Sequence, residues 1–210
     1  MPQPKDETRL ERRSLPVREL RVNKEDGKIV GYASVFDETT NIGGMFDEVV
    51  RPGAFARAIK EKQDVRALWN HDSNVILGRT KAGTLRLEED KKGLWIEIDP
   101  PNTQAAHDLM ESMNRGDVDS MSFAFVATEE TWTERKDEPT LRELKDLNLF
   151  DISAVTYAAY EGTSVGLRSA ESVYQDHVQS LEGQAPEIDD EPQAVGLEPD
   201  EARELAELIT

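Results

Sequence analysis

The chain has 210 residues, with 43 acidic and 25 basic side chains, a net charge of −18 and no cysteine. A charge of this sign repels nucleic-acid backbones and anionic lipid headgroups, so neither is an expected partner. The missing cysteines exclude disulfides, thiol nucleophiles and thiolate metal sites, and no apolar run is long enough to cross a bilayer. We therefore expect a soluble cytoplasmic protein with polar ends, and the N-terminus does not resemble a secretory signal.

The uneven charge predicts three segments: a charged arm over residues 1–14, a folded domain over 15–168 and an acidic tail over 169–210. Residues 171–210 hold 12 acidic side chains and one basic side chain. Such a composition buries too little apolar surface to offset chain entropy, so the tail is expected to be largely disordered. Residues 199–209 could form a short amphipathic helix that begins at Pro199.

Strands dominate the predicted domain. Two helices are expected, over residues 53–62 and 103–115, and the second has apolar side chains at helical spacing and Gly116 as its stop. A charged loop is expected over residues 133–140. Apolar and β-branched runs predict strands over residues 29–36, 65–70, 75–79, 84–88, 94–99, 118–127, 141–149 and 152–157. Many short strands with few helices indicate a mainly β, α+β protein built as a barrel or a sandwich.

One strand, over residues 118–127, combines a bulky side with a small, polar one. Because side chains alternate along a strand, Met121 and Phe123 should face the core, while Ser120, Ser122 and Ala124 point the other way. A small polar side suits a cleft that another backbone must approach closely. The alternative interpretation is that both serines are ordinary solvent-facing residues.

A serine nucleophile needs a base, and His71 is the best placed of the three histidines. His107 should lie on the exposed side of its helix, and His177 lies in the acidic tail. His71 follows an apolar strand at a turn, where scaffolds commonly present reactive groups. Histidine as a residue type has an unperturbed pKa of about 6.5, which suits a general base. His71 could instead be a turn residue bonded to Asp72. No histidine pair has helical metal-ligand spacing, so we expect no metal site.

Asp151 is a candidate partner for that base, since it opens an apolar strand. A carboxylate can hold one imidazole nitrogen so that the other accepts a proton. The alternative interpretation is that the Asp151 carboxylate only accepts hydrogen bonds from nearby backbone amides. Composition and spacing do not establish that His71, Ser122 and Asp151 meet.

Seven segments occur in a recognisable order, namely GYASVF (31–36), VRPGAF (50–55), LWNHD (68–72), ILGR (76–79), GLW (93–95), SMSFAF (120–125) and DISAVT (151–156). Together they resemble the prohead maturation proteases of tailed bacteriophages, which are capsid serine peptidases related in fold to herpesvirus assemblin. The likeness covers about residues 13–168.

This resemblance implies a closed or partly closed β-barrel of the herpesvirus-protease type. It makes His71 the general base, Ser122 the nucleophile and Asp151 the third catalytic member, where relatives often have glutamate. Two departures are Ser120 and Ala124, which replace glycines of the family pattern and could narrow the cleft. Ser120 is also a rival nucleophile on the same side of the strand.

The implied function is a serine endopeptidase of head assembly that works in the host cytoplasm, inside the assembling prohead. Its substrates would be the scaffold segment of the major capsid protein, or a separate scaffold protein, and its own tail. Self-association as a dimer is expected, and no cofactor is implied. The alternatives are a non-catalytic capsid-assembly or scaffolding factor on the same barrel, and a generic β-rich binding domain.

Overall fold

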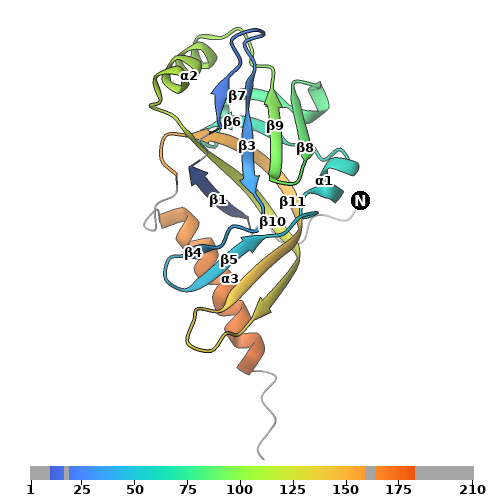
Figure 1. Ribbon diagram of the computed structural model, residues 1–210, viewed down its shortest axis with the longest axis vertical. Helices are drawn as coiled ribbons and strands as arrows, with labels where there is room; N and C mark the ends of the chain where they lie inside the picture. Colours follow the sequence, from blue (N-terminus) through green and yellow to red (C-terminus); the bar gives the residue numbers. More distant parts are fainter. Residues whose placement is uncertain (1–9, 17–18, 159–163, 183–210) are drawn as a thin grey trace, which may run out of the picture. The chain divides into compact units, whose positions relative to one another are not determined.

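The structure is a computed structural model that describes residues 10–16, 19–158 and 164–182 (Figure 1). Its strands, together with α1 and α2, lie in one compact unit, Met1–Val178. Of the second unit, Gln179–Thr210, only the last residues of α3 are described. No helix among the described residues is long and apolar enough to span a membrane.

The described elements are mostly strands, with three α-helices and one 3₁₀ turn. The helices are α1 (Ala56–Lys60), α2 (Gln104–Arg115) and α3 (Ser164–Glu182), and the 3₁₀ turn is η2 (Thr80–Ala82). The strands are β1 (Glu11–Pro16), β2 (Arg21–Val22), β3 (Ile29–Val35), β4 (Thr40–Ile42), β5 (Phe46–Val50), β6 (Arg66–Trp69), β7 (Asp72–Arg79), β8 (Leu85–Glu89), β9 (Gly93–Ile98), β10 (Ser120–Thr133) and β11 (Leu141–Val155). The predicted mainly β, α+β class is confirmed.

Among the described residues the strands form two sheets. The first has seven strands and is organised around the long antiparallel pair β10 and β11, which lie side by side in Figure 1. β1 pairs with β10, while β11 pairs in parallel with β5 near its start and with β6 near its end. β4 and β7 complete this sheet, and the second sheet has the order β2-β3-β9-β8. Apolar side chains from both sheets and from α1 and α2 share one buried core.

The expected closed or partly closed barrel is not found in the described part of the chain. The hydrogen-bonded order of the first sheet ends at β1, β4 and β7, and that of the second ends at β2 and β8. A barrel requires the last strand to pair with the first. The protein instead has two open sheets that pack their apolar side chains together.

Elements of secondary structure extend across both predicted boundaries of the domain. The boundary between residues 14 and 15 falls inside β1, where Glu11 is buried in an ion pair with Arg142 that sequence composition does not show. The tail was expected from residue 169, yet α3 continues to Glu182 and buries Ala170 and Val173. Residues 183–210, including the possible helix over 199–209, lie outside the described residues.

Helix α2 was predictable from signals within its own segment, namely its capping residue, its apolar spacing and its terminal glycine. The Thr103 side chain accepts a hydrogen bond from the Ala106 amide, which caps the first turn. Gly116 adopts a left-handed φ of 83°, a common way to end a helix. Ala106, Leu109 and Met113 form the buried stripe, so the predicted helix over residues 103–115 is confirmed.

Candidate active site

Strand β10 has the two sides that its alternation predicts. Met121 and Phe123 are fully buried in the apolar core. Ser120, Ser122 and Ala124 occupy the opposite face of the strand and are also buried, with Ser122 completely inaccessible to solvent. The small, polar face that the sequence predicts is therefore covered at Ser122, whose hydroxyl contacts the His71 ring.

His71 is presented by a tight turn between β6 and β7. Trp69 and Asp72 are strand partners, so Asn70 and His71 form a two-residue hairpin loop. Their φ angles are 53° and 57°, as in a type I′ turn. The Asn70 amide donates to the Ala154 carbonyl at 2.9 Å, and the Thr156 amide donates to Asn70 Oδ1 at 2.9 Å. These bonds clamp the turn onto the end of β11.

A β-bulge at Phe150 sets the direction of Asp151. Ala124 pairs with Asp151 and Phe125 pairs with Leu149, so Phe150 is an extra residue without a partner on β10. Leu149 before the bulge and Ile152 after it both lie in the apolar core. One more residue between them reverses the alternation, which turns Asp151 toward the face that carries Ser122. This reversal explains why the sequence predicts two strands where β11 is continuous.

The three side chains meet in a linear chain of hydrogen bonds. His71 Nε2 lies 2.7 Å from Ser122 Oγ, and His71 Nδ1 lies 2.6 Å from Asp151 Oδ1. The side chains of His71 and Asp151 are only 12% and 13% exposed. With an ionised Asp151 accepting from Nδ1–H, Nε2 is left to accept the Ser122 proton. The arrangement can therefore abstract a proton from Ser122 while the carboxylate compensates the resulting imidazolium.

Comparison with protein families gives a match over residues 13–176 to the caudovirus prohead serine protease family. The chain belongs to this family. It is 32% identical over 154 residues to the prohead protease of Enterobacteria phage HK97, a match that covers 71% of this chain and 62% of that relative. The chain thus spans less than two thirds of the relative's length.

Among solved structures, that of the bacteriophage T4 capsid assembly protease is similar, with a TM-score of 0.42 and 11% sequence identity. The match covers 70% of this chain and 95% of that one. The family resemblance predicted from the sequence motifs is confirmed by the family match, which includes every residue of the hydrogen-bonded chain.

Ser120, the rival nucleophile in this member of the prohead protease family, does not bond to His71 but to its neighbour Asp119. Ser120 Oγ donates to Asp119 Oδ1 at 2.9 Å, whereas the bonds that His71 makes in the described residues go to Ser122, Asp151 and Ser153. His71 is likewise not bonded to Asp72, whose carboxylate accepts from the Asn74 amide at 2.8 Å. Geometry therefore favours Ser122 over Ser120 as the partner of the base.

Ser153 is a fourth polar member that sequence reasoning missed. Its hydroxyl donates to Asp151 Oδ1 at 2.9 Å and lies 3.2 Å from His71 Nδ1. The sequence does contain a hint of this role, because Asp151 and Ser153 are two residues apart in a strand and must share a face. The hint could be used only once it was known that this face also carries the nucleophile.

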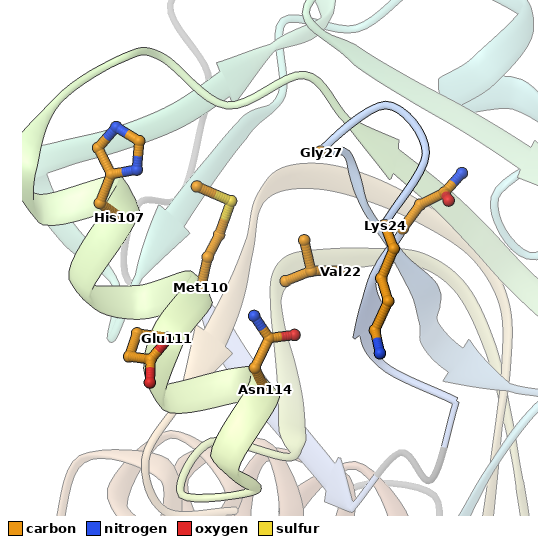
Figure 2. A pocket seen from close by; sticks show the side chains of 8 residues that line it. Val22, Lys24, Gly27, His107, Met110, Glu111 and Asn114 are labelled. Carbon is orange, nitrogen blue, oxygen red and sulfur yellow. The ribbon is translucent and has the colours of Figure 1, made fainter.

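The other two histidines lie apart from this site. His107 is exposed on α2, as predicted, and its ring is 2.8 Å from Asn102 Oδ1. His177 on α3 stacks on the Trp132 ring at 4.4 Å. Figure 2 shows His107 in a groove between α2 and the chain around β2. That groove is lined by Val22, Asn23, Lys24, Gly27, His107, Met110, Glu111 and Asn114, and none of the hydrogen-bonded triad contributes to it.

Proposed function

We propose that this chain is a prohead serine endopeptidase, with Ser122 as nucleophile, His71 as general base and Asp151 as the group that orients the base. The observation that carries the proposal is the Ser122–His71–Asp151 hydrogen-bond chain, with its hydroxyl fully buried, in a member of the prohead serine protease family. A buried hydroxyl bonded to an imidazole, itself bonded to a carboxylate, is the recurring device of serine acyl transfer.

The mechanism follows from the geometry. His71 Nε2 takes the Ser122 proton as Oγ attacks the scissile carbonyl carbon, and the resulting imidazolium is stabilised by Asp151. The imidazolium then protonates the leaving amine as the peptide C–N bond breaks, which leaves an acyl ester on Ser122. A water molecule, deprotonated by His71, hydrolyses that ester and restores the enzyme.

The proposed substrates are the scaffold segment of the major capsid protein, or a separate scaffold protein, and the chain's own C-terminal residues. Extended segments enter protease grooves as strands, whereas a folded helix cannot. Since residues up to Glu182 are helical in α3, we place self-cleavage within residues 183–210. The proposed place of action is the assembling prohead in the host cell, with the capsid protein and a second copy of this chain as partners.

The decisive experiment is co-expression of the full chain with the major capsid protein of its own phage. Capsid protein is expected to be shortened by wild-type protease and to stay intact with Ser122→Ala, a loss of at least about 10⁴-fold. Ser120→Ala is the matched control, because it removes a buried hydroxyl from the same strand face without touching His71, and it should cleave like the wild type.

Mass spectrometry of both chains gives the cleavage positions and the state of residues 183–210. Cleavage that persists in Ser122→Ala would contradict the assignment of the nucleophile. Capsid assembly without cleavage by the wild type would favour the non-catalytic assembly factor instead.

A further inference from the structure

We propose that Ser153 is a positioning residue of this site, which holds the Asp151 carboxylate in the orientation that His71 requires. The inference rests on the proposed function, since it concerns how the same hydrogen-bond chain is kept in register. It adds a fourth side chain to the three that were selected from the sequence.

The bonds of the Ser153 hydroxyl point to this role. Its side chain is completely buried, and buried hydroxyls are nearly always hydrogen-bonded. Within the described residues, its hydrogen bonds go to Asp151 Oδ1, at 2.9 Å, and to His71 Nδ1, at 3.2 Å. The Ser153 hydroxyl therefore donates its proton to the Asp151 carboxylate, while its oxygen faces the Nδ1–H group of His71.

The carboxylate needs such a donor. Asp151 Oδ1 accepts both from His71 and from Ser153, and the described part of the chain supplies no hydrogen bond to Oδ2. Rotation about the terminal torsion of aspartate is broad and only weakly restricted by its own geometry. Two donors from different elements, converging on one oxygen, fix the plane of the carboxylate where one donor would leave it free to turn.

The backbone of Ser153 is held in place by strand pairing on both sides. Ser153 and Ser122 are partners across the antiparallel pair β10 and β11, so both side chains leave the sheet on the same face. On its other side, β11 pairs with β6, where Ser153 lies opposite Leu68. The donor that orients the acid is thus anchored in the same central ladder as the nucleophile, while His71 comes from a turn.

The test uses the full chain and a fluorophosphonate probe, which forms a phosphonate ester with an activated serine. We expect Ser153→Ala to label about tenfold more slowly than wild type, the effect of one hydrogen bond to a charged group. Ser120→Ala is the matched control, since it deletes another buried hydroxyl from the same face, and its labelling rate should equal that of the wild type.

A second measurement separates positioning from packing. Ser153 acts through Asp151, so Ser153→Ala added to Asp151→Ala should slow labelling no further, whereas independent effects of packing would multiply. In proton NMR spectra, the His71 Nδ1–H resonance should shift or be lost in Ser153→Ala and stay unchanged in Ser120→Ala.

Equal labelling rates for Ser153→Ala and wild type would overturn this inference and leave the proposed function intact. So would a multiplicative effect in the Asp151→Ala background. A wild-type chain that processes no capsid protein and never carries the probe on Ser122 would overturn the proposed function, and this inference with it.

Discussion

The backbone of His71 is strained in a way that its side chain explains. Asn70 and His71 follow each other in the left-handed region, with φ angles of 53° and 57°. Asparagine tolerates this region, but the second position of a type I′ turn usually carries glycine. A side chain with a Cβ costs roughly 1–2 kcal/mol there. Such strain is common at functional residues, and here the hydrogen bonds of the imidazole to Ser122 and Asp151 help to compensate for it.

Comparison of His71→Gly with His71→Ala isolates that strain. Both variants lose the same imidazole and the same hydrogen bonds, so both should lose activity. The glycine variant should nevertheless be more stable than the alanine variant by about 1 kcal/mol, because only alanine retains the Cβ in the left-handed region. Urea unfolding monitored by tryptophan fluorescence measures the difference, and an alanine variant of equal or greater stability would contradict it.

At the level of the element, the bulge at Phe150 decides whether β11 can contribute to the site. Just before the bulge Leu147 and Leu149 face the core, and after it Ile152 and Ala154 do. The extra residue lets one strand fill the core along its whole length and still turn Asp151 and Ser153 to the other face. Phe150 itself is 46% exposed, so its insertion, more than its side chain, carries the effect.

Deletion of Phe150 should therefore be far more damaging than Phe150→Ala. Without the extra residue, Asp151 would point into the apolar core or Leu149 would leave it, and either outcome separates the carboxylate from His71. We expect fluorophosphonate labelling of Ser122 to fall by at least about 10³-fold in the deletion, as when a triad acid is lost, and by less than about twofold in Phe150→Ala. Normal labelling of the deletion variant would show that the bulge does not set the direction of Asp151.

Across the whole molecule, a buried charge cluster joins β1 to the rest of the first sheet. Arg142 on β11 is 1% exposed and donates to both oxygens of Glu11, at 2.6 and 2.8 Å, and to Glu48 on β5 at 2.9 Å. Arg13 pairs with the same two glutamates, and Glu130 also bonds Arg142. The cluster thereby fastens β1 beside β10, where Ser14 is the strand partner of Ser122.

This cluster makes stability depend on pH. Burial alone would raise the pKa of Glu11, but Arg13 and Arg142 outweigh it and hold the pKa below its ordinary value of 4.5. A carboxyl with a pKa lowered by folding stabilises the protein fully above its unfolded pKa, and that stability is lost as the pH falls through the folded pKa. The contribution of Glu11 should therefore disappear as the pH is lowered below about 4.5.

Glu11→Gln tests this contribution. At pH 7 the variant should lose about 3–5 kcal/mol of unfolding free energy, the usual effect of removing one partner from a buried ion cluster. The difference between wild type and variant should shrink as the pH falls below about 4.5, since the wild-type carboxyl then becomes protonated. Urea unfolding at a series of pH values gives the difference, and a gap that stays constant down to pH values of about 2 would refute the assignment.

The sequence predicted correctly those helices and strands whose signals lie within one short segment. The apolar run of β3 and the capped, periodic helix α2 were recognisable because their signals lie within one segment. β1 lies partly in the segment predicted as a charged arm, because Glu11 and Arg13 look exposed until their ion partners on β5 and β11 are known. The same limit hid α3, whose buried Ala170 and Val173 stand in an acidic context.

The sequence by itself determined the family, the mainly β class and the choice of His71, Ser122 and Asp151, since motifs and strand alternation are properties of short segments. Only the tertiary structure decided that these side chains meet, across separations of 51 and 80 residues, and that Ser153 joins them. The physical reason is that contact between strands depends on pairing, register and bulges. These are set by hydrogen bonds between distant segments, and a one-residue shift in them turns a side chain to the opposite face.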